Sequence, residues 1–242
     1  LYQLKSKIPI DFDLASHGDE RKMAISHLAS VSKNDVVVYD RGYFSYALLD
    51  EHVKKGIHPI FRIKSKASKA IDAFIASDET DEVVQIPNPK ISKQESEETA
   101  ITLRVVKYTE AGTTYILGTT LLDRDLYTIK DLSDTYHSRW GIEELYKISK
   151  QLMTIEEFHA QSERGVKQEL FAHFILITLT RIFSNHSEDH LNSSSRPIEE
   201  EKIKANFKNA LVTMARNIEG LFLQQSELVS KTVNNIIASI SL

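Results

Sequence analysis

The sequence contains no cysteine, which excludes disulfide bonds and thiolate metal sites. It also shows no charged-then-apolar leader, and together these absences favour a cytoplasmic protein. No apolar run is long enough to cross a bilayer. The most apolar segment, 171–183, is short and contains His173 and Arg181, so we expect a buried helix and no membrane partner.

An excess of positive charge is missing too. The formal net charge is −4, whereas proteins that bind nucleic acid are usually basic. Positive charge is instead local, in two clusters: Arg41, Arg62, Lys64, Lys66 and Lys69, and then Arg139, Lys147 and Lys150. The acidic residues concentrate elsewhere, in 78–82, 95–98 and 199–201. This asymmetry permits DNA binding without requiring it.

Strands alternate with helices in the first quarter of the sequence. Period-two alternation at 8–14 predicts extended chain, and short apolar runs predict buried strands at 36–39 and 58–63. Helices are predicted at 21–31, from helical spacing, and at about 44–55, and a further short helix near 67–76 opens the next stretch of the sequence. Such alternation indicates an α/β layout.

The pattern then changes twice. A β-rich stretch follows, with runs at 82–87, 99–108 and 113–121, the last two joined by a hairpin turn at 110–112. From Thr128 onward the sequence predicts helices, including 203–223, interrupted by a polar loop at 184–196.

Segment 136–150 carries polar residues at helical spacing. At about 100° per residue, four side chains fall within roughly 60° of one another on a single helix: Tyr136, Arg139, Glu143 and Lys150. The apolar residues Ile142, Leu145, Ile148, Leu152 and Met153 fall on the opposite side. The polar line could hold a phosphodiester beside a metal-binding carboxylate. A solvated face is the alternative, because Arg139–Glu143 and Glu143–Lys147 are i,i+4 pairs, each worth about 0.2–0.5 kcal/mol.

Asp40 follows the apolar run 36–39, at the carboxyl end of an expected buried strand. Ligands of open α/β sheets gather at such strand ends. The alternatives are that Asp40 caps the next helix or pairs with Arg41. If Asp40 and Glu143 meet at one site, their oxygens suit Mg²⁺ or Mn²⁺, and two such ions can promote attack on a phosphodiester.

These residues carry a resemblance to a known family. Segment Asp40-Arg41-Gly42-Tyr43 resembles the D-R-G-Y segment of bacterial insertion-sequence transposases of the DDE class. Tyr136, Arg139, Glu143 and Lys150 match the Y-x2-R-x3-E-x6-K signature of one large branch of that class. The β-rich stretch is similar as well, and the resemblance extends from about residue 1 to about residue 223.

The resemblance implies an RNase H-like catalytic core that uses Mg²⁺ or Mn²⁺ to cleave DNA at transposon ends and to join the freed 3′-hydroxyl to target DNA. It implies that Asp40 and Glu143 are the second and third members of an acidic metal-binding triad. It also implies that Tyr136, Arg139 and Lys150 contact transposon-end DNA, and we add Lys147 and Arg41 as DNA-binding candidates. A homodimer acting on paired ends is a further expectation.

One departure from the family pattern matters. The family's first catalytic Asp lies on the first strand of the sheet, whereas Asp11 and Asp13 resemble positions on the third strand. We therefore expect an RNase H-like fold that is incomplete at its N-terminus and lacks the first Asp. Two predictions follow: little DNA cleavage by this chain alone, because metal affinity depends on the number of ligands, and an unpaired strand edge beside Asp40.

The expected organisation has four segments. Residues 1–63 form the first part of the RNase H-like core, and residues 64–122 a β-rich insertion. Residues 123–184 form the second part of the core with the helix of Glu143, and residues 185–242 a helical C-terminal region. Three alternative functions stay open: a DNA-binding transposase remnant without turnover, an unrelated nuclease with a similar core, and a structural protein without a site.

Overall fold

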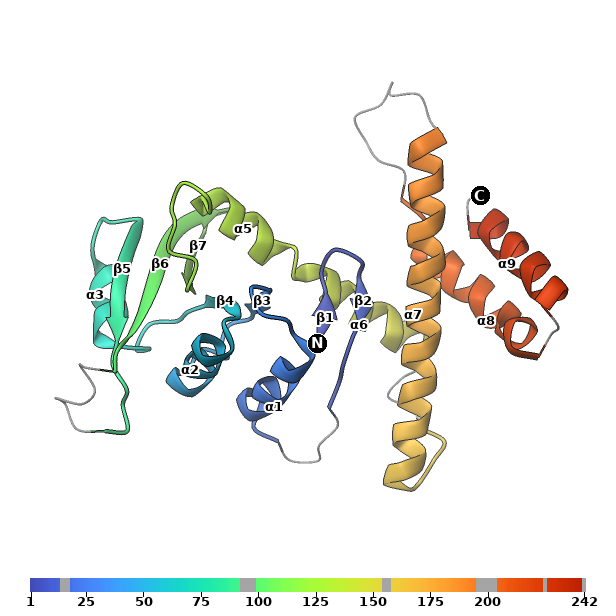
Figure 1. Cartoon of the computed structure of the whole chain (residues 1–242), viewed down its shortest axis with the longest axis horizontal. Coiled ribbons are helices and arrows are strands. Elements are labelled where there is room, and N and C mark those ends of the chain that lie inside the picture. The colour runs from blue at the N-terminus through green and yellow to red at the C-terminus, as the bar shows by residue number, and fades with distance from the viewer. Residues whose placement is uncertain (14–17, 92–98, 154–157, 195–203, 224–225, 241–242) are drawn as a thin grey trace. The chain divides into compact units, whose positions relative to one another are not determined.

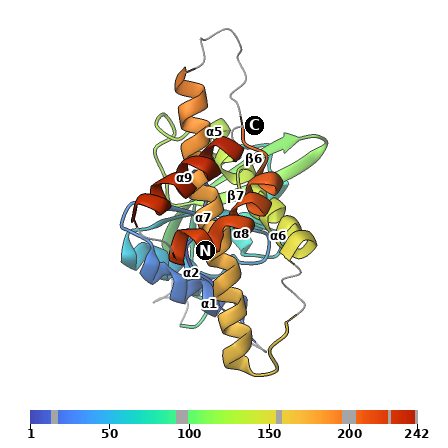
Figure 2. The same cartoon turned by 90° about the vertical axis from the view of Figure 1, so that its right-hand side faces the viewer.

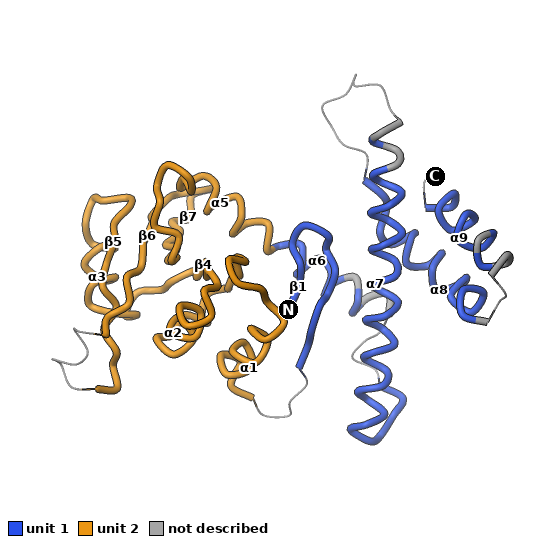
Figure 3. Tube along the Cα trace, viewed as in Figure 1, with its two compact units in different colours: residues 1–14, 140–242 blue, residues 15–139 orange. Residues whose placement is uncertain are grey.

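The computed structural model describes residues 1–13, 18–91, 99–153, 158–194, 204–223 and 226–240 (Figure 1). Contacts divide the chain into two compact units, each with its own core. One unit contains residues 15–139, and the other contains residues 1–14 and 140–242 (Figure 3).

The unit of residues 15–139 is built on a mixed five-stranded sheet. Its strands are β3 (Val36–Tyr39), β4 (His58–Arg62), β5 (Asp81–Ile86), β6 (Ile101–Glu110) and β7 (Thr113–Thr119). Their order is β3-β4-β7-β6-β5, with β3 and β4 parallel and the other pairs antiparallel. The predicted strands and hairpin are confirmed. The β-rich stretch extends the same sheet, because β7 pairs with β4.

Strict alternation along the strands gives the sheet two apolar faces. Phe61, Leu103 and Val105 point to one face, where they pack with residues of α1 (Glu20–His27), α2 (Tyr46–Lys55) and α3 (Lys69–Ala76). Ile60 and Val106 point to the other face, where they pack against α5 (Ile129–His137). The result is a mixed α/β fold with helices on both sides, compatible with the expected class.

The second unit begins with a two-stranded ribbon, β1 (Tyr2–Gln3) and β2 (Ile8–Pro9), which is separate from the five-stranded sheet. The extended period-two chain expected over 8–14 therefore forms a strand at Ile8–Pro9 alone among the described residues, and Leu14 lies outside them. Four helices follow: α6 (Trp140–Met153), α7 (Glu163–Ser194), α8 (Phe207–Leu223) and α9 (Ser226–Ile240). The last three pack together around Met214 and Ile236 (Figure 2).

The polar loop predicted at 184–196 is wrong over its described part. Helix α7 continues through Ser194, and 195–196 lie outside the described residues. The polar composition suggested a loop, but several of these side chains are buried or hydrogen-bonded within the unit. Ser184 and Ser187 are buried, Asn185 donates to the Ser6 carbonyl at 2.8 Å, and Asn192 donates to the Glu188 carbonyl at 2.7 Å.

None of the described helices combines the length and the hydropathy needed for a membrane span.

Candidate functional site

Asp40 follows the last residue of β3, as its position after an apolar run predicted. The residue does not cap the next helix: Ser45 caps α2, and its hydroxyl accepts from the Leu48 N–H at 3.3 Å. The Asp40 side chain, which is 45% exposed, instead faces two side chains from the last residues of the unit's sequence. It accepts a hydrogen bond from the Tyr136 hydroxyl at 3.3 Å and lies 3.7 Å from the Arg139 guanidinium.

Tyr136 reaches Asp40 from α5. This helix begins with a capping box, in which the Thr128 hydroxyl accepts from the Asp131 N–H and the Asp131 carboxylate accepts from the Thr128 N–H. One face of α5 packs on the sheet through Leu132 and Tyr136. The Tyr136 side chain is fully buried, so its hydroxyl is held in place beside Asp40.

Arg139 lies in a tight turn between two helices, which corrects the prediction of one continuous helix. Helix α5 ends at His137 and α6 begins at Trp140. The Ser138 hydroxyl donates to the Thr135 carbonyl at 2.6 Å, and the Arg139 N–H bonds to the Tyr136 carbonyl instead, at 3.2 Å. The Thr135 carbonyl is the acceptor that the Arg139 N–H would use in a continuous helix, so the Ser138 hydroxyl competes with the helical hydrogen bonds at this point. The four signature residues therefore do not share one helix face.

Charge around the Tyr136 phenol is predominantly positive. Burial raises the pKa of Tyr136 above its ordinary value, and the Asp40 charge acts in the same direction. Arg62 opposes this through hydrogen bonding and charge, and Arg139 opposes it through charge. The guanidinium carbon of Arg139 lies 5.7 Å from the centre of the Tyr136 ring. Asp40 thus contacts one guanidinium group and a phenol, and a second guanidinium, that of Arg62, acts on the same phenol.

The remaining predicted site residues lie elsewhere. Arg41 is next to Asp40 in the sequence and is exposed. Glu143, Lys147 and Lys150 lie on α6, at i, i+4 and i+7, so they share one face of that helix, and all three are exposed. Asp40, Tyr136 and Arg139 are brought together in the unit of residues 15–139, whereas Glu143, Lys147 and Lys150 belong to the other unit.

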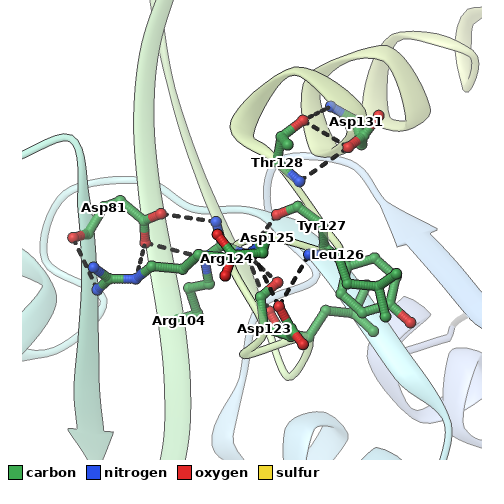
Figure 4. Close-up of polar contacts among 10 residues, drawn as sticks. Asp81, Arg104, Asp123, Arg124, Asp125, Leu126, Tyr127, Thr128 and Asp131 are labelled. Atoms are coloured by element: carbon green, nitrogen blue, oxygen red, sulfur yellow. Dashed lines mark hydrogen bonds and ion pairs between the residues drawn. The ribbon is translucent and has the colours of Figure 1, made fainter.

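Sequence reasoning missed the residue that anchors the start of α5. Arg104 on β6 is almost fully buried and binds both carboxylate oxygens of Asp81, at 3.0 and 2.7 Å (Figure 4). Its Nη1 also donates to three carbonyls of the segment before α5: Leu121, Asp123 and Tyr127, at 3.4, 3.3 and 2.7 Å. One signal was available, since Arg104 lies between the apolar residues Leu103 and Val105 of a predicted strand.

The donor chemistry suits a divalent metal ion only in part. Carboxylate oxygens are the ligands that Mg²⁺ and Mn²⁺ prefer, and the Asp40 and Glu143 side chains are both accessible. One oxygen of Asp40, however, already contacts Tyr136 and Arg139. Among the described residues, no group of three or more His, Asp or Glu side chains gathers where it could hold a metal ion.

Comparison with known proteins decides the family. The model of the transposase DDE domain matches residues 1–179, well over half of the chain. The chain belongs to this DDE transposase family. The resemblance to DDE transposases is thereby confirmed, whereas membership of the Y-x2-R-x3-E-x6-K branch stays a prediction.

Two curated relatives of this DDE transposase chain come from bacterial insertion sequences. The chain is similar to the "Probable transposase for insertion sequence element IS5377" of Geobacillus stearothermophilus, with 26% identity over 66% of this chain and 42% of the relative. It is also similar to "Transposase InsG for insertion sequence element IS4" of Escherichia coli (strain K12), with 24% identity over 71% of this chain and 40% of the relative. The chain therefore spans about two fifths of the length of either relative.

Proposed function

We propose that this chain is part of a DDE transposase that cleaves DNA at transposon ends and joins those ends to target DNA. The observation that supports the proposal most is the contact of Asp40 with Tyr136 and Arg139. Two motifs 96 residues apart in the sequence, each family-like by itself, converge on one carboxylate at the end of a sheet strand.

In this proposal Asp40 and Glu143 hold divalent metal ions. When bound, Mg²⁺ or Mn²⁺ would increase the nucleophilicity of the attacking oxygen and stabilise the leaving oxygen of the phosphodiester. Tyr136 keeps the Asp40 carboxylate oriented, because its ring is buried and its hydroxyl is directed at Oδ1. Arg41, Arg139, Lys147 and Lys150 would contact DNA directly. Tyr136, the fifth DNA-binding candidate, has a buried side chain, so its contact with DNA would require its hydroxyl to become accessible beside Asp40.

We further propose that the 242 residues by themselves cleave DNA poorly. Metal affinity rises with the number and geometry of the ligands, and Asp40 and Glu143 are the two carboxylates that the family motifs identify here. The division into RNase H-like core, β-rich insertion and helical C-terminal region, with the boundaries given above, remains part of this proposal. So do the cytoplasmic location and the homodimer on paired ends.

A DNA-binding protein without turnover is the second candidate. It is favoured by the basic surroundings of Asp40, whose carboxylate forms an ion pair with Arg139. It is also favoured because the described residues include no group of three or more possible metal ligands. In that case DNA affinity would fall steeply with salt and would not depend on a metal ion.

Glu143→Gln separates the two candidates. Binding to a fluorescein-labelled duplex is measured in Mn²⁺ and in EDTA over a salt series, and nicking of supercoiled plasmid is followed in parallel. The metal-dependent proposal predicts tighter binding in Mn²⁺ for the unaltered chain and loss of that gain in Glu143→Gln. Glu219→Gln, which removes one negative charge from an exposed position on α8, far along the sequence from both motifs, is the control. Metal-independent binding in both proteins would favour the second candidate, and the absence of salt-dependent DNA binding would contradict both.

A further inference from the structure

Arg62 lies beside Asp40 at the carboxyl end of the sheet. The parallel register pairs Tyr39 of β3 with Phe61 of β4, so the next two residues, Asp40 and Arg62, are neighbours at the same end. Alternation along β4 directs Arg62 to the same face as Ile60, which is the face that α5 covers. Arg62 and Tyr136 therefore meet on one side of the sheet.

The Arg62 side chain is held between two tyrosines. Its guanidinium carbon lies 4.7 Å from the centre of the Tyr115 ring on β7. The guanidinium also acts on the Tyr136 hydroxyl by hydrogen bonding and charge, which lowers the pKa of that phenol against the larger effect of burial. A cation stacked on one ring and lying close to the hydroxyl of another has lost much of its rotamer freedom before any ligand arrives.

The charge of Arg62 has no carboxylate partner among the described residues. The ion pair of Asp40 is made with Arg139, and none of the described ion pairs includes Arg62. A guanidinium has five N–H donors, and the Tyr136 hydroxyl can accept only one of them at a time. None of the Arg62 nitrogens is both buried and without a partner, so the remaining donors are open to solvent.

We propose that Arg62 binds a phosphate of the DNA strand that approaches Asp40, an inference that rests on the proposed function. The planar fork of N–H donors fits two oxygens of a phosphate, and stacking on Tyr115 leaves the edge of that fork available. Tyr136, fixed between Arg62 and Asp40, links the phosphate-binding group to the carboxylate. The insertion strand β7 thereby contributes to substrate binding through Tyr115.

The dependence of DNA affinity on salt tests this role. Anisotropy of a fluorescein-labelled duplex is measured between about 50 and 200 mM salt for the unaltered chain, Arg62→Gln, Arg62→Lys and the control Arg124→Gln. Loss of one phosphate contact should reduce the slope of log K against log salt by about 0.9, which corresponds to roughly tenfold weaker binding at the lowest salt. Arg62→Lys should keep the slope, because its charge remains, but bind more weakly than arginine. Arg124, an exposed residue that pairs with Asp81, should change neither quantity.

The slope distinguishes phosphate binding from a purely structural role. If Arg62 only holds the Tyr136 hydroxyl in place, its loss weakens DNA binding equally at every salt concentration and leaves the slope of log K against log salt unchanged. That result, or an affinity within twofold of the unaltered chain, would overturn the inference while salt-dependent binding by the unaltered chain kept the proposed function standing. If Arg62→Gln does not fold, a reduced slope in Arg62→Lys would likewise overturn it. Absence of salt-dependent binding by the unaltered chain would overturn the proposed function and this inference together.

Discussion

Replacing Arg104 with methionine should destabilise the unit of residues 15–139 by about 3–4 kcal/mol. The Arg104 side chain is 1% exposed and makes five hydrogen bonds, two to Asp81 and three to backbone carbonyls. Methionine fills most of the volume but satisfies none of these acceptors. Breaking a buried ion pair costs about 3–5 kcal/mol. We use the lower part of that range because Asp81 keeps 16% exposure and a contact with Arg124 at 3.5 Å.

Urea unfolding and thermal unfolding, both followed by circular dichroism, measure this loss, and hydrogen exchange shows where it acts. We expect a melting temperature lower by about 10 °C and faster exchange in β5, β6 and residues 121–128. Arg124→Met is the matched control: Arg124 binds the same carboxylate but is 54% exposed, so its loss should cost less than about 1 kcal/mol. A loss below about 1 kcal/mol in Arg104→Met, or equal losses in both variants, would refute the reasoning.

Two further changes test the surroundings of Asp40 and the core beneath it. Tyr136→Phe should lower the unfolding free energy by about 1 kcal/mol, since the hydroxyl loses its bond to Asp40 and its interaction with Arg62 while the ring stays buried. Tyr136→Ala should cost about 4 kcal/mol because the fully buried ring is lost, and similar thermal melts for the two variants would contradict this assignment. Burial lowers the pKa of His52 from 6.5 to about 4, so the unfolded chain takes up its proton at higher pH than the folded one. Stability should therefore fall as the pH drops from about 6.5 to about 4, by at most about 3 kcal/mol, and a His52→Gln variant that kept the full pH dependence would show that another group is responsible.

The sheet of this chain was largely predictable because its signals are local. Apolar runs and period-two alternation reflect the burial of one or both faces of a strand, and they located β3, β4, β6 and β7 within a few residues. A glycine at position 56, where φ is +64°, marks the end of α2 in the same local way. The position of Asp40 at a strand end followed from these signals.

The predicted helix spanning Tyr136 to Lys150 is divided in two, and the periodic spacing of apolar residues could not have revealed the cause. Helical spacing is the same on both sides of Ser138, yet its hydroxyl takes a backbone carbonyl and the ladder is interrupted. The polar segment after Ser184 failed in the opposite way. Its side chains look like those of a loop, but Asn185 donates to the Ser6 carbonyl and Asn192 to the Glu188 carbonyl of α7 itself.

By itself, the sequence determined the strands and most helices, the two family motifs and the acidic and basic residues available for chemistry, because each depends on neighbours within a few positions. Only the tertiary structure decided that β7 pairs with β4, that Tyr115 therefore lies against Arg62, and that Tyr136 contacts a carboxylate 96 residues earlier. Such contacts depend on strand register and on the packing of α5 against the sheet. Both join residues far apart in the chain, so the pattern of apolar residues within either segment does not predict them.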